Sequence, residues 1–304
     1  MSGASNTRGA SKRKPPHTAS NATADAASAA SARSDARPGG RIGRRFAALR
    51  ARGERALVPF LTAGDPDLET TEALVLAMAE AGADVIELGV PFSDPTAEGP
   101  TIQRSSSRAL ARGTSLRAIL RLVARLRARV EQPLVLMGYA NPIHAMGAEA
   151  FAKAAAEVGV DGIIIPDLPP EDGKPWLDPC RALGIDPILL AAPTTPPERL
   201  ALLVRETRGF LYAVSLQGVT GARATLAKGI EAQVRLAKSM SDIPVCVGFG
   251  VSTPEQAGEI GRFADGVVVG SAFVDRIERA ASKAEAIDEV ARFVAELKAP
   301  LRAR

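Results

Sequence analysis

The chain of 304 residues has few of the residue types on which several protein classes depend: two cysteines, two histidines and only 4% aromatic residues. The cysteines, Cys180 and Cys246, set no disulfide framework, and Cys246 lies in an apolar run typical of a core. With only His17 and His144 available, we expect no metal site. No apolar run approaches the roughly 20 residues that cross a bilayer, so we expect no membrane partner and a cytoplasmic location.

Basic residues are concentrated near the start of the chain. Residues 1–45 hold nine Lys and Arg against two acids, which leaves 29 basic and 32 acidic groups elsewhere. We therefore expect no nucleic-acid partner for the folded part. Residues 1–40 are rich in Ala, Ser and Arg and predict a disordered tail before a single domain at 41–304. No secretory signal is expected, while a transit peptide or a nuclear signal at residues 12–14 remains an alternative.

After the tail, short aliphatic runs alternate with stretches of helix-forming composition. Each run is bounded by Gly, Pro or Asp, as is typical of buried parallel strands. We predict eight strands, at Leu57–Leu61, Asp84–Leu88, Leu134–Met137, Gly162–Ile165, Pro187–Leu190, Phe210–Val214, Ile243–Val247 and Val267–Val269. The predicted helices are Leu68–Ala81, Leu116–Val130, Ala148–Val158, Pro196–Glu206, Ile230–Ser239 and Pro254–Gly261.

This alternation predicts an α/β fold, a (β/α)8 TIM barrel preceded by the disordered N-terminal extension. A doubly wound sheet is the alternative, but it would carry a G-x-G-x-x-G turn after the first strand, and Leu61–Pro66 is no such turn. A barrel gathers the loops that follow its strands at one face. We therefore expect the functional residues in those loops.

Two glutamates stand out around the end of the second strand. Glu87 lies near the end of that strand, and a rigid turn rich in Pro and Gly carries Glu98. Two carboxylates on a stiff loop suggest acid/base chemistry on a small molecule. The alternative is a strand end followed by solvated acids.

Closely spaced glycines follow each of the last three strands, at Gly218–Gly221, Gly248–Gly250 and Gly270 with Ser271. Such loops leave backbone N–H groups free to converge on an anion. Any one of them could be only a tight turn. Three in consecutive order predict a phosphate site, which barrels often hold at their last loops.

Together, these segments resemble the α subunit of tryptophan synthase. The block ELGVPFSDPTAEGPTIQ at Glu87–Gln103 is similar to the active-site signature of that family. Shorter similar segments follow in the family's order, at Val58–Phe60, Gly64–Pro66, Tyr139–Pro142, Gly218–Gly221, Gly248–Gly250 and Gly270–Ser271. The resemblance covers roughly residues 42–300.

The resemblance implies cleavage of indole-3-glycerol phosphate to indole and glyceraldehyde 3-phosphate. The indole would pass to a β subunit that carries pyridoxal phosphate, in an α2β2 assembly, and this chain would need no cofactor. Glu87 would protonate the indole ring carbon, Glu98 would stabilise positive charge on the indole N–H, and Thr220 would lie on a closing loop. The remaining implied contacts are the phosphate residues Gly221, Gly250, Gly270 and Ser271, and the pocket walls Phe60 and Tyr212.

The pKa of Glu87 and the side-chain length of Glu98 decide how well the two carboxyl groups can act in this reaction. As an acid, Glu87 would benefit from a raised pKa, and we expect Ile86, Leu88 and Val90 to assist by desolvation; an unshifted Glu87 could instead shuttle a proton from the substrate hydroxyl. Where the family usually has Asp, this chain has Glu98, which moves the carboxylate by about 1.5 Å. A misplacement of about 1 Å can cost roughly a hundredfold in rate. We expect the loop to compensate.

Other functions on the same barrel were weighed against this one. A Schiff-base aldolase needs a lysine at a strand end, and no predicted strand contains one. A free-standing lyase that releases indole remains open, as does a non-catalytic barrel that only regulates the β subunit. The partner surface is expected at Pro91, Asp94 and Pro95, in a loop at the barrel mouth.

Overall fold

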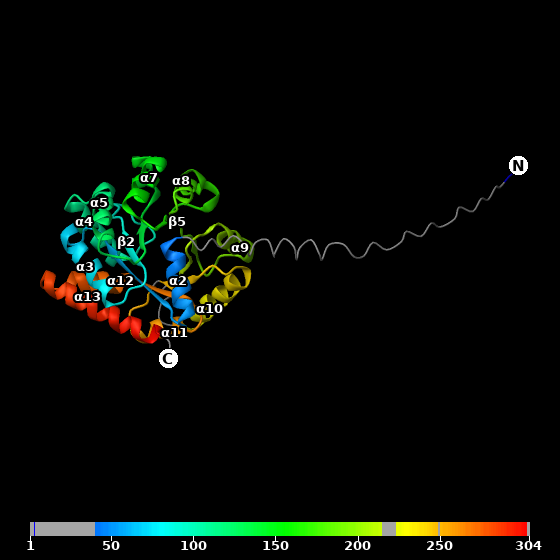
Figure 1. Ribbon diagram of the computed structural model, residues 1–304. Helices are drawn as coiled ribbons and strands as arrows, with labels where there is room; N and C mark the ends of the chain where they lie inside the picture. Colours follow the sequence, from blue (N-terminus) through cyan, green and yellow to red (C-terminus); the bar gives the residue numbers. More distant parts are fainter. Residues whose placement is uncertain (1–2, 4–39, 215–222, 249, 303–304) are drawn as a thin grey trace. The chain divides into compact units, whose positions relative to one another are not determined.

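The computed structural model describes residue 3 and residues 40–214, 223–248 and 250–302 (Figure 1). The chain divides into two units, Met1–Asp35 and Ala36–Arg304. Apart from residue 3, the first unit lies outside the described residues, so the disordered tail stays a prediction. Within the described parts of the chain, no helix is both long and apolar enough to cross a membrane.

The second unit is built on one sheet whose paired strands are all parallel. Its order, β5-β4-β3-β2-β1-β9-β8-β7-β6, follows the chain from neighbour to neighbour except where β1 meets β9. All eight predicted strands are confirmed within a few residues. The strands are β1 (Ala56–Thr62), β2 (Ile86–Gly89), β3 (Leu134–Met137), β4 (Gly162–Ile164), β5 (Asp186–Pro187), β6 (Leu190–Ala191), β7 (Leu211–Val214), β8 (Val245–Gly248) and β9 (Gly266–Val269).

The fifth strand position of the barrel is split into β5 and β6. β5 pairs with β4, and β6 pairs with β7. Between them, the Ile188 amide donates to the Ile163 carbonyl of β4 at 2.9 Å, and the Leu189 carbonyl accepts the Tyr212 amide of β7 at 3.0 Å. One segment, residues 186–191, therefore pairs on both sides and joins the two ends of the sheet. The predicted (β/α)8 barrel is confirmed.

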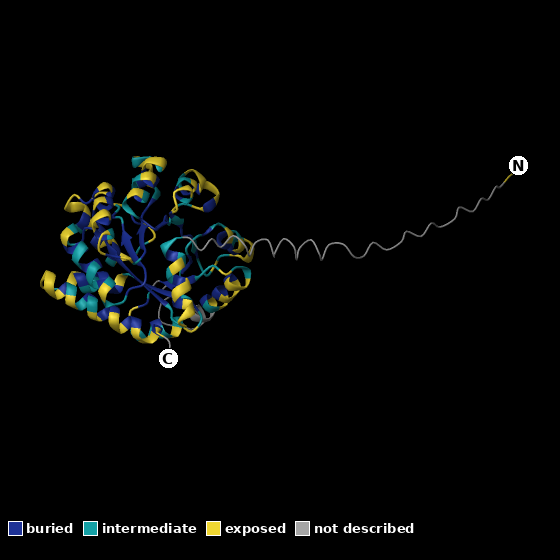
Figure 2. Cartoon of the chain, viewed as in Figure 1, coloured by how far each residue is buried: buried dark blue, intermediate teal, exposed yellow. Residues whose placement is uncertain are grey.

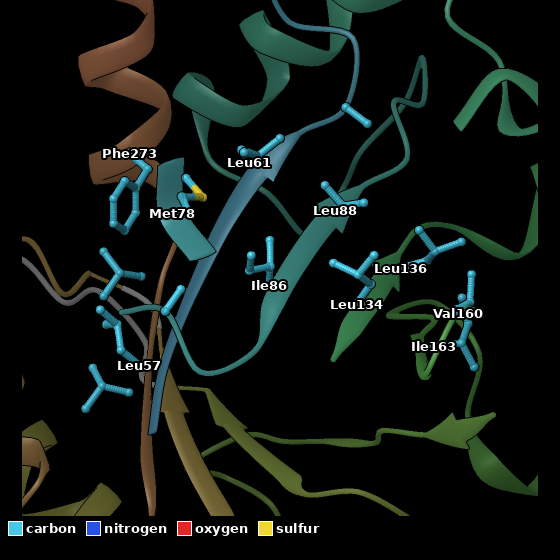
Figure 3. Close-up of a cluster of buried hydrophobic side chains, with 14 of the residues drawn as sticks. Leu57, Leu61, Met78, Ile86, Leu88, Leu134, Leu136, Val160, Ile163 and Phe273 are labelled. Atoms are coloured by element: carbon cyan, nitrogen blue, oxygen red, sulfur yellow. The ribbon is translucent and has the colours of Figure 1, made fainter. Parts of the chain in front are cut away.

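Alternation along the strands separates two cores. In β1, Val58 and Phe60 belong to the cluster inside the barrel, whereas Leu57 and Leu61 belong to the cluster between strands and helices. Figure 3 shows part of this outer cluster, including Leu57 and Leu61 of β1 and Phe273 of a surrounding helix. Most strand residues are buried, and the helices expose their outward faces (Figure 2).

The six predicted helices are confirmed: α3 (Leu68–Ala81), α5 (Leu116–Arg127), α7 (Ala148–Val158), α9 (Pro197–Glu206), α10 (Arg223–Met240) and α11 (Pro254–Ile260). Six more were not predicted: α2 (Arg41–Ala51), α4 (Pro100–Ala111), α6 (Ala140–Met146), α8 (Pro170–Ala182), α12 (Ser271–Arg279) and α13 (Lys283–Lys298). Among these, α2 supplies Ile42, Phe46 and Leu49 to the inner cluster and so covers the amino-terminal end of the barrel. The opposite end is left to the loops.

A repeated hydrogen bond fastens that amino-terminal end. A side chain just before each of β2, β4, β7 and β9 accepts a backbone amide from the preceding strand position of the barrel. The bonds run from Leu57 to Asp84 at 2.8 Å, from Leu134 to Asp161 at 2.9 Å, from Leu189 to Thr207 at 3.0 Å and from Val245 to Asp265 at 3.0 Å. Buried acids at this end therefore have structural partners.

Candidate active site

Glu87 is an ionisable residue inside the barrel. It lies on β2 in register with Phe60 of β1 and Val135 of β3, both of which belong to the inner cluster. Its neighbours in sequence, Ile86 and Leu88, point to the outer cluster instead. Val90, the third residue expected to assist, also packs against the outer cluster. The prediction that these three residues desolvate Glu87 is therefore wrong. The apolar surroundings of Glu87 come from the barrel interior.

The Glu87 carboxyl is 1% exposed, and neither of its oxygens has a hydrogen-bond partner among the described residues. Burial raises the pKa of Glu87 to about 8, and the nearby Glu98 carboxylate adds to the increase. At pH 7, a carboxyl group with this pKa is protonated in about nine molecules of ten. Glu87 is thus prepared to donate a proton at neutral pH.

Glu98 lies in the turn that leads into α4, half-buried at the mouth of the barrel. The Tyr139 hydroxyl donates to Oε2 of Glu98 and itself accepts the Ala97 amide at 2.8 Å. Burial raises the pKa of Glu98, the bond from Tyr139 opposes that increase, and the charge of Asp167 adds to it. The two glutamates interact electrostatically, so the structure brings the two predicted carboxylates to one site.

Phe60 and Tyr212, the predicted pocket walls, are both buried in the inner cluster. Each one packs against a strand glycine. A Cβ atom on Gly89 would lie 2.5 Å from Cζ of Phe60, and a Cβ atom on Gly248 would lie 2.5 Å from the Tyr212 hydroxyl. Burial, and secondarily the charge of Glu87, raise the pKa of Tyr212 well above its ordinary value. Two aromatic rings therefore share the interior with Glu87.

The predicted phosphate residues fall partly on the described chain. Gly270 joins β9 to α12, so Ser271 is the first residue of that helix, where backbone N–H groups are unpaired and the helix dipole favours an anion. A Cβ atom on Gly270 would lie 3.5 Å from the Phe60 ring, which puts this helix end beside the pocket wall. Gly250 has a φ of +79° in the loop after β8. Thr220 and Gly221 lie outside the described residues.

The three predicted interface residues differ in exposure. Pro91 and Pro95 are buried, and Asp94 is exposed between them. Ser93 donates to the Asp94 carboxylate at 2.5 Å. The prolines therefore shape the loop, while Asp94 presents a negative charge to solvent.

Sequence reasoning missed the residues that fasten α4 beside the site. Arg108 of α4 donates two bonds to the buried Asp65, at 2.8 and 2.7 Å, and a third to Glu278 of α12 at 2.6 Å. Arg104, one turn earlier, donates two bonds to the same Glu278. The arginines thus connect the helix after Glu98 with the helix after Gly270. The sequence identifies Asp65 as an acid at the end of the first strand, but nothing in it points to the partner of Asp65.

No group of three or more His, Cys, Asp or Glu side chains in the described ranges is arranged to hold a metal ion. The buried lysine Lys298 contacts Asp84 at 2.8 Å and the Arg55 carbonyl at 2.9 Å, at the amino-terminal end of the barrel. It is therefore held away from the carboxylates of the mouth.

Comparison with known proteins agrees with this geometry. Residues 46–302 match the family described as tryptophan synthase alpha chain. The tryptophan synthase alpha chain of Citrifermentans bemidjiense is 54% identical over 258 residues, and that of Burkholderia pseudomallei is 51% identical over 262 residues. These alignments span 85% and 86% of this chain and 96% of each relative.

Solved structures agree in fold as well as in sequence. The tryptophan synthase subunit alpha of Legionella pneumophila superposes with a TM-score of 0.79 at 37% identity, over 86% of this chain and 98% of that one. A chain of tryptophan synthase from M. tuberculosis, in an open form, gives the same TM-score and identity over 88% and 100% of the two chains. On this extent of similarity, the chain belongs to the tryptophan synthase alpha chain family.

Proposed function

We propose that this chain cleaves indole-3-glycerol phosphate to indole and glyceraldehyde 3-phosphate, as the α subunit of tryptophan synthase. The observation that carries the proposal is the unpaired carboxyl of Glu87, buried in the barrel of a chain that belongs to this family. The family consists of lyases of tryptophan biosynthesis. The finer assignment, a carbon–carbon lyase that acts by aldol-type cleavage, is part of the proposal.

Glu87 acts as the general acid. Its raised pKa, about 8, keeps the proton available at neutral pH. Transfer of that proton to the ring carbon that bears the glycerol phosphate chain turns the indole ring into an electron sink. The bond to the chain then breaks, and its electron pair restores the aromatic ring. The adjacent hydroxyl gives its proton to the Glu87 carboxylate and becomes the aldehyde of glyceraldehyde 3-phosphate, so Glu87 ends the cycle protonated again.

Glu98 stabilises the positive charge that develops on the indole N–H. Its position in the loop that follows the strand of Glu87, and the electrostatic coupling between the two carboxyl groups, support this role. Phe60 and Tyr212 enclose the substrate, because they are the aromatic side chains of the inner cluster nearest the mouth. Thr220 is proposed to close over the bound substrate on the loop after β7.

The phosphate of the substrate binds at the loops that follow the last three strands. The amino terminus of α12, with Gly270 and Ser271, supplies N–H groups and a hydroxyl, and the loops with Gly221 and Gly250 complete the site. The packing of Gly270 beside the ring of Phe60 supports one continuous pocket from the phosphate to the indole.

Indole passes from this chain to a β subunit, which holds the pyridoxal phosphate; this chain carries no cofactor of its own. We propose that the β subunit docks at the loop with Pro91, Asp94 and Pro95, where the exposed Asp94 can meet a basic residue. An α2β2 assembly and a cytoplasmic location are proposed with it. We also propose that residues 1–40 form a disordered extension and that residues 41–304 form the catalytic domain.

Indole release from indole-3-glycerol phosphate tests the proposal. The purified chain is assayed alone and with a saturating β subunit, and Glu87→Gln serves as the blank. We expect weak release alone, a strong increase with the partner and none from the variant. Fast release without a partner would instead indicate a free-standing lyase. No release in either condition would contradict catalysis and favour a barrel that only regulates its partner.

A further inference from the structure

Tyr139 follows β3 and is 3% exposed, yet its hydroxyl reaches the turn that carries Glu98. It accepts the Ala97 amide at 2.8 Å and donates to Oε2 of Glu98. The hydroxyl is therefore used in both directions, and both contacts lie within two consecutive residues of the β2–α4 loop. A hydroxyl held by an N–H donor is fixed in orientation, so its own proton is aimed at the carboxylate.

The ring of Tyr139 is fixed by the same loop. Phe92 stacks on it with a centroid distance of 5.0 Å and an interplanar angle of 25°. Phe92 lies near the start of the loop, and Ala97 and Glu98 lie near its end. One side chain, two residues after a neighbouring strand, therefore connects both parts of the loop and holds Glu98.

The length of Glu98 gives this contact its importance. Glutamate has one more rotatable bond than aspartate, so its carboxylate can occupy a wider range of positions. A hydrogen bond from a fixed hydroxyl to one oxygen restricts that range and leaves further acceptor sites for an indole N–H. The bond also lowers the pKa of Glu98 against the effect of burial, which favours the charged form.

We propose that Tyr139 is a positioning residue that holds the carboxylate of Glu98 toward the indole N–H and so compensates for the longer side chain. This inference rests on the proposed function. Tyr139 acts through Glu98 and takes no part in the proton transfer.

A double-mutant cycle tests it. Wild type, Tyr139→Phe, Glu98→Gln and the double variant are assayed for indole release with a saturating β subunit. A misplacement of about 1 Å can cost roughly a hundredfold in rate. We expect Tyr139→Phe to lower kcat between about tenfold and a hundredfold in the wild-type background. In the Glu98→Gln background, the same change should cost less than about twofold, because no carboxylate remains to be positioned. Equal losses in both backgrounds, or no loss in either, would overturn the proposal.

A titration separates this proposal from the proposed function. The Glu98 carboxyl is followed by carbon-13 NMR with labelled glutamate, and its signal is assigned from its absence in Glu98→Gln. Removal of the hydroxyl should raise the pKa of Glu98 in Tyr139→Phe. An unchanged pKa overturns the contact, whether or not the chain releases indole. Absence of indole release in wild type would overturn the proposed function. The titration could still detect the contact between Tyr139 and Glu98, but that contact would then have no role in catalysis.

Discussion

Replacement of the buried acid should stabilise the protein while it abolishes activity. Glu87→Gln keeps the size of the side chain but removes its charge. Because the pKa of Glu87 is raised in the folded state, the folded protein retains a proton that the unfolded chain loses. Wild type and variant should therefore be similarly stable near pH 4.5, and the wild type should become the less stable of the two as pH rises toward 8.

The magnitude follows from the two pKa values. The pKa of Glu87 rises from an ordinary 4.5 to about 8 in the folded state. Each pKa unit of this difference corresponds to about 1.4 kcal/mol of free energy. The cost of holding the charge inside the barrel is then about 3 kcal/mol at pH 7 and approaches about 5 kcal/mol above pH 8. Between pH 5 and pH 8.5, the difference in free energy of unfolding should widen by about 4 kcal/mol in favour of the variant.

Urea unfolding at a series of pH values measures this difference. Glu296→Gln, at an exposed position of α13, is the matched control, and its difference from wild type should change little with pH. A difference between Glu87→Gln and wild type that stays constant from pH 5 to pH 8.5 would refute the reasoning, because Glu87 would then titrate alike in the folded and unfolded states.

Two further substitutions separate stability from catalysis. Asp161→Ala leaves the half-buried charge of Arg127 without its carboxylate, so we expect a loss of about 3–5 kcal/mol in urea unfolding, with kcat retained by the folded fraction. A large fall in kcat per folded molecule would contradict this separation of the two barrel ends. Gly89→Ala places a Cβ atom against the ring of Phe60, so we expect kcat/KM for indole-3-glycerol phosphate to fall by about tenfold or more. Gly43→Ala, where a Cβ atom meets nothing within 4 Å, should leave kcat/KM unchanged; equal effects of the two glycine substitutions would refute the packing argument.

The barrel could be predicted because its strands carry a strong local signal. Runs such as Leu134–Met137 are aliphatic on both faces and are bounded by Gly or Pro. This pattern is typical of parallel strands that are buried on both faces. The helices were harder. α4 begins with Pro100 and contains three consecutive serines, and α8 includes Pro175 and Pro179, so composition favoured loops in both places. Packing against the barrel, rather than propensity, makes these segments helical.

For the active site, sequence reasoning predicted which residues end the strands but not how they interact. Glu87 is in register with Phe60, and its charge acts on Tyr212; both residues lie far from it in sequence and approach it only in the folded barrel. Likewise, the bond between Tyr139 and Glu98 joins residues 41 positions apart. Such contacts depend on strand register and side-chain direction, which no local pattern contains.

The most direct test of Glu87 as the general acid is the pH dependence of kcat/KM for indole release, measured with a saturating β subunit. The proton-donating form should be lost with an apparent pKa near 8, so the rate should fall tenfold for each further pH unit. The substrate phosphate titrates near pH 6 and leaves this alkaline limb unaffected. Enzyme held at pH 9.5 and assayed again at pH 7 controls for unfolding. A rate that stays constant to pH 9.5 would contradict the assignment of Glu87 as a buried proton donor.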